Sequence, residues 1–398
     1  PDGRRQCRCR SPPRQCRGYD EYGHGTHVAG IIAARAYRTA PVPDADSGMA
    51  PAAHLINLKV LDSHGDGYAA DVIEAIDFAV RYRREFNIRV INLSLGAAPT
   101  QSYKDDPICL AVERAAKAGI VVVASAGNFG QTPDGKLVYG SITSPGISPF
   151  AITVGALRTN GTLDRSDDEV APWSSKGPTL VDHLVKPDLV APGSKIVSAA
   201  VASSTLATEH PERFLDGPGA RDYMSLSGTS MAAAVVSGAA ALVLDGRNNL
   251  TPVQVKLALQ ASADFMPREG LLASGAGSLN LEDLNLTRAI LRASGKAPAA
   301  NAFALSLSPF DKTSSQVIVW GDIIVWGDII VWGDVIVWGN SARANDVIVW
   351  GNTATAQDII VWGNTSRAEG IIVWGDVSSN VIVWGELASA SGIIVWGD

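Results

Sequence analysis

The sequence predicts an α/β protein in which a parallel β-sheet is flanked by helices, followed by a C-terminal β-rich repeat region. Two observations support this prediction. Between residues 24 and about 290, short apolar runs alternate with stretches of helical periodicity, a pattern typical of parallel sheets with crossover helices. After residue 316, an apolar unit of strand-forming residues recurs many times.

Three apolar runs are predicted as strands and four segments as helices. The predicted strands are His54–Leu61, Arg89–Leu95 and Ile120–Ala124. Ala69–Tyr82 has apolar residues at 72, 75, 76, 79 and 80, the spacing of one helix face. The other predicted helices are Ile108–Ala118, Thr229–Leu244 and Pro252–Ala263. In such a fold, functional side chains are expected at the carboxyl ends of the strands.

Composition and charge exclude several classes of protein. The 398 residues are 46% hydrophobic and 18% charged, as in an ordinary globular protein. The formal net charge of −7 lies entirely between Gln316 and Asp398, so nothing indicates a nucleic-acid binder. No apolar run reaches the roughly 18 residues that a transmembrane helix needs.

The segment 1–19 is an atypical leader rich in arginine and cysteine. Positions 1–17 include six arginines and no Val, Ile, Leu or Phe, so they cannot form a core strand. A metal cluster at Cys7, Cys9 and Cys16 is the alternative, but no histidine or fourth cysteine follows at ligand spacing. We expect this leader to be disordered or an artefact of gene prediction, and the chain shows no signal peptide.

The C-terminal region repeats one short unit. After a predicted linker at 293–315, rich in Ala, Ser and Pro, the unit (Ile/Val)-Ile-Val-Trp-Gly occurs nine times within residues 316–398. All but one of the spacings between its tryptophans are multiples of six, so each can return to an equivalent place in a stack. An acidic or amide residue follows the glycine of every unit and opposes aggregation. A β-solenoid or stacked hairpins would satisfy this pattern.

Ser230 lies in Ser227-Gly228-Thr229-Ser230-Met231-Ala232, directly before an alanine-rich helix. The unpaired N–H groups and the dipole of a helix N-terminus favour negative charge, which suits a nucleophile whose intermediate bears an oxyanion. The alternative is a Ser or Thr that merely caps a core helix.

Two further motifs carry polar side chains suited to catalysis. Gly23-His24-Gly25-Thr26-His27 has two histidines at a helix start, which could be metal ligands or include a general base. Ala124-Ser125-Ala126-Gly127-Asn128 ends an apolar strand. The side-chain amide of Asn128 could donate to an oxyanion, whereas the alternative is a left-handed turn asparagine.

Together, these three motifs resemble the subtilisin family of serine peptidases over residues 20–292, which we take as a subtilisin-like peptidase domain. Other segments that resemble the family are Gly48–Ala53, Lys59–Leu61, Val90–Gly96, Thr153–Ala156, Ser174–Pro178 and Lys186–Gly193. The resemblance implies that Ser230 attacks the scissile carbonyl, that His24 takes its proton, and that Asn128 helps to hold the oxyanion.

The resemblance also implies substrate-binding residues. Ser94, Leu95 and Gly96 resemble one substrate-binding edge of the family, and Gly65, Asp66 and Gly67 resemble the other. A polypeptide substrate would pair with these edges as an added strand. Ser125, Ala126 and Gly127 would line the pocket for the residue before the cleaved bond, and their small side chains leave room for a large apolar group. Asp66 would favour a basic substrate residue, or is simply an exposed loop carboxylate.

The sequence departs from the family at the acidic member of the catalytic triad. In the family, this aspartate ends the first core strand, well before the base, whereas His24 stands close to the start of this sequence. Asp20 belongs to the loop before the histidine motif, and Asp2 has no strand before it. We therefore assign no residue to this role, and we expect the natural chain to extend upstream. Ala234 stands where family members usually carry proline.

The family resemblance has consequences for cofactors and location. Family members often bind calcium as a structural ion, and Asp44 and Asp46 in the loop Tyr37–Ser47 are candidate ligands, although two carboxylates in a Pro-rich loop are usually solvated. No other cofactor is expected. A secreted or cell-surface location is implied.

Two functions therefore compete. The first is a serine endopeptidase acting through Ser230, His24 and Asn128. The second is a non-catalytic surface or assembly protein in which a decayed peptidase body carries the Trp-Gly repeats, through which the chain would self-associate. The missing acid favours the second, and the retained catalytic motifs favour the first.

Overall fold

The computed structural model describes residues 19–35, 47–162, 164–215, 222–245, 250–266 and 268–282, together with nine strands between 317 and 396. Residues 1–18 of the predicted leader at 1–19, Asp44 and Asp46, and the predicted linker at 293–315 lie outside these residues. Within the described part of the chain, no helix is both long and apolar enough to cross a membrane.

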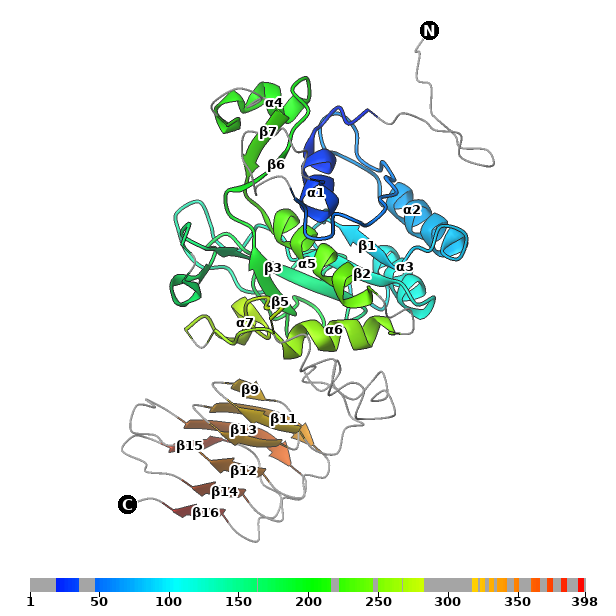
Figure 1. Ribbon diagram of the computed structural model, residues 1–398. Coiled ribbons are helices and arrows are strands. Elements are labelled where there is room, and N and C mark those ends of the chain that lie inside the picture. Colours follow the sequence, from blue (N-terminus) through cyan, green and yellow to red (C-terminus); the bar gives the residue numbers. More distant parts are fainter. Residues whose placement is uncertain are drawn as a thin grey trace.

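A parallel sheet forms the centre of the body between residues 19 and 282 (Figure 1). Strands β1 (Val90–Leu93), β2 (Val121–Ser125), β3 (Ala151–Arg158) and β5 (Leu189–Pro192) pair in that order, each parallel to its neighbour. The short strand β4 (Glu169–Val170) adds an antiparallel pairing to β3. This is the predicted α/β fold, with the strands' carboxyl ends on one edge.

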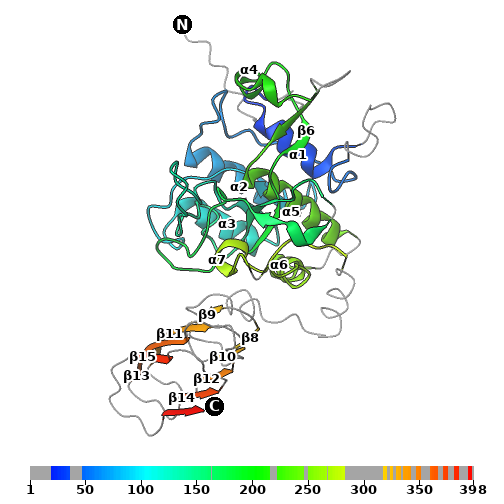
Figure 2. The same cartoon turned by 90° about the vertical axis from the view of Figure 1, so that its left-hand side faces the viewer.

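Helices cover both faces of this sheet, as Figures 1 and 2 show. One face packs with α1 (His24–Ala33), α5 (Thr229–Leu244) and α6 (Pro252–Ala261) in a single apolar cluster. The other face packs with α2 (Ala69–Tyr82) and α3 (Pro107–Lys117). Strand β2 serves both clusters because successive side chains of a strand point to opposite faces. Val121 and Val123 belong to the first cluster, whereas Val122 and Ala124 belong to the second.

Smaller elements surround this core. Strands β6 (Ile196–Ala199) and β7 (Tyr223–Leu226) form an antiparallel pair next to α1. The short helices are η1 (Arg165–Asp167), α4 (Thr205–Glu209), η2 (Pro211–Arg213) and α7 (Leu271–Ser274).

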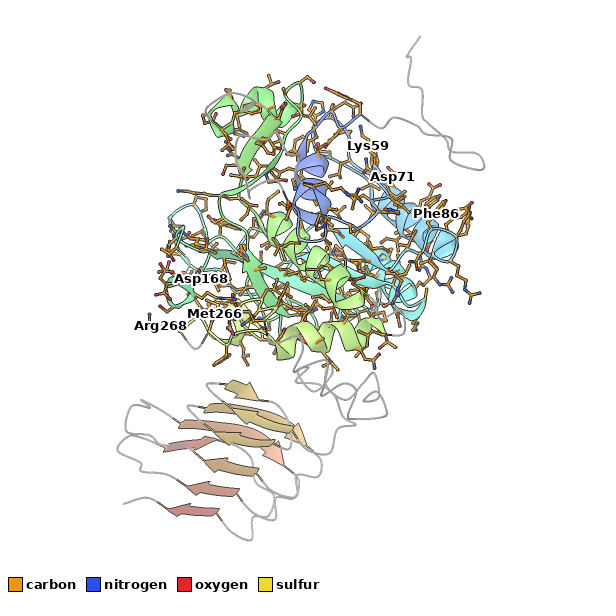
Figure 3. All side chains as sticks on the ribbon, viewed as in Figure 1. Lys59, Asp71, Phe86, Asp168, Met266 and Arg268 are labelled. Carbon is orange, nitrogen blue, oxygen red and sulfur yellow. The ribbon has the colours of Figure 1, made fainter. Side chains whose placement is uncertain are left out.

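Most predicted elements are confirmed, with α2 and α5 at the predicted residues, but the strand predicted at His54–Leu61 is wrong. This segment has no strand structure, and Leu55 is 50% exposed. Lys59, labelled in Figure 3, forms an ion pair with Glu21. The physical reason is the lack of a neighbour, because β1 ends the sheet and no described strand pairs with its outer edge. An apolar run becomes a strand only when another strand satisfies its backbone groups.

The described repeat strands alternate between two parallel sheets. Strands β8, β10, β12, β14 and β16 form one sheet, and β9, β11, β13 and β15 form the other. Equivalent residues pair, such as Trp332 with Trp350 and Trp338 with Trp362. This pattern is that of a solenoid rather than of stacked hairpins, whose strands would be antiparallel. The strand bounds are Val317–Trp320, Ile323–Val325, Ile329–Trp332, Val335–Ser341, Val347–Trp350, Ile359–Thr365, Ile371–Trp374, Val381–Trp384 and Ile393–Trp396.

Candidate active site

Ser230 lies in the first turn of α5 and is partly buried. Gly228 occupies the N-cap position, so the alternative that Ser230 merely caps the helix is wrong. The backbone N–H of Gly228 donates to the carbonyl of Gly193, 2.8 Å away, which holds the turn before the helix in place. The Ser94 hydroxyl donates to the Ser230 carbonyl at 2.7 Å, and the Ser230 hydroxyl lies 3.5 Å from the Ser94 carbonyl. The hydroxyl is thus held at a helix N-terminus, beside the end of β1.

Asn128 is oriented by the residue before Ser230. Its Oδ1 accepts hydrogen bonds from the backbone N–H of Thr229 at 2.9 Å and from the Thr229 hydroxyl at 3.0 Å. The amide nitrogen Nδ2 consequently remains available as a donor, and the residue is exposed. Its backbone is outside the left-handed region, so the turn-asparagine alternative does not apply.

Gly228 lies close to two potential oxyanion donors. A Cβ atom at this position would lie 3.5 Å from Nδ2 of Asn128 and 3.7 Å from the backbone nitrogen of Ser230. The two donors therefore approach one point at the positive end of α5. A developing negative charge there would be stabilised by both hydrogen bonds and by the helix dipole.

His24 begins α1, and the loop before it is anchored by Asp20. The Asp20 carboxylate accepts hydrogen bonds from the N–H of Gly23 at 2.8 Å, from the N–H of Thr26 at 2.7 Å and from the Thr26 hydroxyl at 2.8 Å. Gly23 has a φ of 96°, which favours glycine. Asp20 thus satisfies N–H groups at the start of the helix and sets the position of its first residue.

The pKa values of His24 and Asp20 are each set by burial and by an opposing interaction. Burial lowers the pKa of His24, and the negative charge of Asp20 partly opposes this effect. Burial raises the pKa of Asp20, but its hydrogen bonds to Gly23 and Thr26 outweigh this and hold the pKa below its usual value. At neutral pH, His24 is therefore neutral and able to accept a proton, while Asp20 is ionised.

Helices α1 and α5 share one apolar cluster and carry their candidate catalytic residues in their first turns. The hydrogen bonds of the described residues include none between the His24 ring and the Ser230 hydroxyl. Catalytic hydrogen bonds are often long without substrate and tighten when it binds. The two residues are thus positioned by packed elements rather than by a direct bond.

Comparison with known proteins decides the family. The model of the subtilase family matches residues 9–295. This chain belongs to the subtilase family. It is 39% identical over 270 residues to the serine protease AprX of Bacillus subtilis. The alignment covers 67% of this chain and 58% of AprX. It is 34% identical over 263 residues to subtilisin E of the same species, covering 66% of this chain and 56% of the relative.

Solved structures give the same fold. Sphericase matches with a TM-score of 0.53 and 29% identity, covering 66% of this chain and 79% of sphericase. The S41 psychrophilic protease matches with a TM-score of 0.53, 30% identity and the same coverage. The chain spans less than two thirds of the length of the two curated relatives named above.

In this subtilase, the second histidine of the motif is structural. His27 is fully buried, and its Nε2 lies 3.1 Å from the carbonyls of both Ile196 and Met224. Its ring therefore connects α1 to the pair β6–β7, and its Nε2 is engaged with backbone carbonyls. Among the described residues, no cluster of three or more His, Cys, Asp or Glu side chains could hold a metal ion.

The first predicted substrate-binding edge follows β1. Ser94 contacts Ser230, as described above, and the Leu95 carbonyl accepts a hydrogen bond from the Ser125 hydroxyl at 3.3 Å. Gly96 is exposed, whereas Ser125, Ala126 and Gly127 are buried. The structure therefore brings the predicted edge and the predicted pocket wall together beside Ser230.

Thr143 also belongs to this region, although the sequence analysis missed it. A Cβ atom at Gly96 would lie 2.6 Å from Thr143 Oγ1, and one at Gly127 would lie 2.7 Å from Thr143 Cγ2. The buried Thr143 therefore packs between the edge and the pocket wall and bounds the space that their small residues leave. No sequence signal could identify it, because it follows no motif and is separated from both glycines along the chain.

The loop of the second predicted substrate-binding edge contacts Tyr22, whose ring lies near the ring of His24. A Cβ atom at Gly65, whose φ is +82°, would lie 2.7 Å from the Tyr22 ring, and this ring is 6.4 Å from that of His24. Asp66 is exposed, and its N–H donates to the Asp62 carboxylate at 3.1 Å. Gly67 is confined in the same loop, since a Cβ atom there would clash with the Val60 carbonyl.

Proposed function

We propose that this chain is the body of a secreted or cell-surface serine endopeptidase that hydrolyses peptide bonds in polypeptides. Ser230 is the nucleophile, His24 the general base, and Asn128 an oxyanion donor. The observation that carries this proposal is the approach of Asn128 Nδ2 and the Ser230 N–H to one point beside Gly228, at the N-terminus of α5.

Each step of the reaction follows from the chemistry of these groups. Neutral His24 accepts the proton as the Ser230 hydroxyl attacks the carbonyl, and the Ser230 N–H and Asn128 stabilise the oxyanion. The protonated ring then gives its proton to the leaving amine. Water, activated by the same ring, releases the acyl group from Ser230. The lowered pKa of His24 keeps the base in its reactive form at neutral pH.

Backbone pairing would hold the substrate. Ser94, Leu95 and Gly96 form one edge and Gly65, Asp66 and Gly67 the other, so that an extended peptide lies between them. The wall of Ser125, Ala126 and Gly127, with Thr143 behind it, receives the residue before the cleaved bond. We expect this pocket to accept apolar side chains whose size Thr143 limits.

The carboxylate that would orient His24 is not found among the described residues, since Asp20 is occupied by the N–H groups of the helix start. We infer that a further apolar strand carrying an aspartate pairs with the open edge of β1. Support comes from that unpaired edge and from the exposed apolar segment at 54–61. Without this aspartate, turnover would be lower by about 10⁴-fold.

A fluorophosphonate probe tests the proposed function, because it bonds covalently to an activated serine. We expect slow labelling of Ser230 in the full chain, abolition by Ser230→Ala and strong reduction by His24→Ala. Ser227→Ala is a matched control, because the Ser227 hydroxyl is nearby but accepts the N–H of Lys195 at 2.8 Å. If the folded chain takes up no label at Ser230, it is not an enzyme of this kind.

The repeat region supports a second candidate function, a non-catalytic surface or assembly protein. Both repeat sheets are parallel and in register, and their outermost strands leave edges that a second copy could extend. The full chain and a chain ending at residue 315 can be compared by analytical ultracentrifugation. If the full chain self-associates and the chain ending at residue 315 does not, the result supports this function. If both chains are monomeric, the result argues against it.

A further inference from the structure

Strands β6 and β7 form a ribbon that leaves the main sheet and carries α4 and η2 between its two strands. We call its described residues, 196–215 and 222–226, the arm. Among the described strands, β6 and β7 pair only with each other, so the parallel sheet does not hold the arm. The arm lies beside α1 in both views of the ribbon (Figures 1 and 2). Its position therefore depends on the contacts that it makes with α1 and with the loop before α1.

The root of the arm is fixed close to Ser230. The N–H of Gly228 donates to the Gly193 carbonyl at 2.8 Å, which joins the two ends of the ribbon where they meet the body. Leu226 at the end of β7 pairs with Ile196 at the start of β6. Ser230 follows in the first turn of α5. The nucleophile and the root of the arm therefore share one short stretch of main chain.

The middle of the arm is bonded to α1. The Ser198 hydroxyl donates to the His27 carbonyl at 2.8 Å. The His27 ring lies 3.1 Å from the carbonyls of Ile196 and Met224, one on each strand of the arm. A Cβ atom at Gly30 would clash with the Ser198 hydroxyl, so α1 and β6 approach each other closely. The helix that begins with His24 is thus fastened to both strands of the arm.

The tip of the arm is bonded to the loop directly before His24. The N–H of Thr205 donates to the Glu21 carbonyl at 2.8 Å, and the N–H of Leu206 donates to the Tyr22 carbonyl at 3.1 Å. Both donors belong to the first turn of α4, whose N–H groups have no partner within the helix. The main chain before His24 supplies the acceptors that this turn needs, so the helix start and the loop stabilise each other.

Close packing accompanies these two bonds. Ser204 is the N-cap of α4 and is fully buried, and its hydroxyl accepts the N–H of Ala207 at 3.3 Å. A Cβ atom at Gly23 would clash with this hydroxyl. Leu206 belongs to the apolar cluster of α1 and α5, and Tyr22 packs against the same cluster. A displacement of α4 would therefore move Gly23 and, with it, the first residue of α1.

We propose that the arm sets the position of the His24 ring relative to Ser230, with the N–H groups of Thr205 and Leu206 as the positioning contacts. This inference rests on the proposed function, in which His24 is the general base. One ribbon of chain is bonded next to Ser230 at its root and to the loop before His24 at its tip. The hydrogen bonds of the described residues include none between the two catalytic side chains, so packed main chain sets their separation.

Proline at position 205 of the full chain tests the tip contact. Proline is favoured at the first residue of a helix and has no N–H, so Thr205→Pro removes the bond to Glu21 while remaining compatible with α4. Ser204 has the extended backbone that a following proline requires, with φ −76° and ψ 163°. Thr205→Ala is the matched control, because it keeps the N–H. Circular dichroism and urea unfolding show whether each variant is folded.

An NMR titration of the histidine rings measures the base without any turnover. Burial lowers the pKa of His24, so release of the loop in Thr205→Pro should raise this pKa toward its ordinary value. The His27 ring is the internal reference, since its contacts lie in the middle of the arm, and its signals at neutral pH should not move. Fluorophosphonate labelling of Ser230 should slow about tenfold or more, because a small misplacement of a catalytic group has an effect of this size. Thr205→Ala should match the unaltered chain in all three measurements.

The outcomes separate this proposal from the proposed function. An unchanged His24 pKa in folded Thr205→Pro, an unchanged labelling rate, or equal changes in Thr205→Ala would overturn the role of the arm. If Thr205→Pro does not fold, Ser204→Ala takes its place, because it removes only the hydroxyl that caps α4 and contacts Gly23. It should shift the His24 pKa in the same direction, and no shift would overturn the proposal. A chain that takes up no label in any form, while its His24 responds to Thr205→Pro, refutes the peptidase alone.

Discussion

At the scale of single residues, burial has the largest effect on the pKa of His24, and the charge of Asp20 opposes it. Its carboxylate accepts three hydrogen bonds from the first turn of α1 and from Gly23. Its charge favours the protonated ring of His24, against the effect of burial. Asp20 is therefore a positioning residue, since it acts through the helix start and through its field.

Replacing Asp20 with asparagine keeps a hydrogen-bond acceptor but removes the charge. We expect Asp20→Asn to lower the pKa of His24 further, because a nearby negative charge stabilises imidazolium. An NMR titration of the His24 ring proton measures this directly, and the acid limb of kcat/KM should move to lower pH. Asp164→Asn, at an exposed turn whose Ser166 N–H it accepts, is the control. An unchanged pKa in Asp20→Asn would show that the field of Asp20 does not reach the ring.

At the scale of elements, His27 joins α1 to the strand pair β6–β7. Its Nε2 faces two carbonyls, and its Nδ1 is buried without a hydrogen-bond partner. Burial lowers the pKa of His27 to about 4. The ring is thus neutral in the folded protein at every pH above this value, and the start of the helix that carries His24 depends on it.

The buried position of His27 between α1 and the pair β6–β7 should make the stability of the protein depend on pH. His27 takes up a proton near pH 6.5 when unfolded but only near pH 4 when folded, so the unfolded state binds more protons between these values. The free energy of unfolding should fall by about 3 kcal/mol from this residue as the pH drops from 6.5 to 4. Urea unfolding at several pH values measures the slope. His27→Gln should flatten it, and an equally steep slope in that variant would assign the acid sensitivity elsewhere.

At the scale of the whole molecule, a buried charge cluster connects the sheet to α6. Asp188, just before β5, lies 2.6 Å from Lys186 and 2.7 Å from Lys256 of α6, and it accepts the N–H of Thr153 in β3 at 2.7 Å. Both ammonium groups also reach the Ala151 carbonyl. All three ionisable groups are buried. Burial lowers the pKa of Lys186 to about 7, against the charge of Asp188.

Loss of the one carboxylate in this cluster should destabilise the whole body. Asp188→Asn removes the counter-charge that the two buried lysines share in this cluster, and we expect a loss of about 3–5 kcal/mol in the free energy of unfolding. The matched control is Asp77→Asn, which removes an exposed ion pair with Arg114 and should cost less than about 1 kcal/mol. Chemical denaturation measures both. Similar losses in the two variants would contradict a structural role for the cluster.

Local pattern alone determined much of this protein. The boundaries of α2 and α5 follow from apolar periodicity and from the glycine-serine signal before the helix, which depend on neighbouring residues only. His24, Asn128 and Ser230 were selected as candidate catalytic residues from motifs, which are also local.

Tertiary structure alone decided the features that depend on distant partners. The run at His54–Leu61 has the composition of a strand but lacks a described neighbour, so it is exposed and irregular. Thr143 joins the site because two glycines distant in the sequence leave space for its side chain. The exposed side chains of Phe129 and Leu137 lie on neighbouring segments because a backbone hydrogen bond from Val138 to Gly130 joins those segments. Strand formation, close packing and surface continuity all need partners far along the chain, and local sequence does not specify where those partners lie.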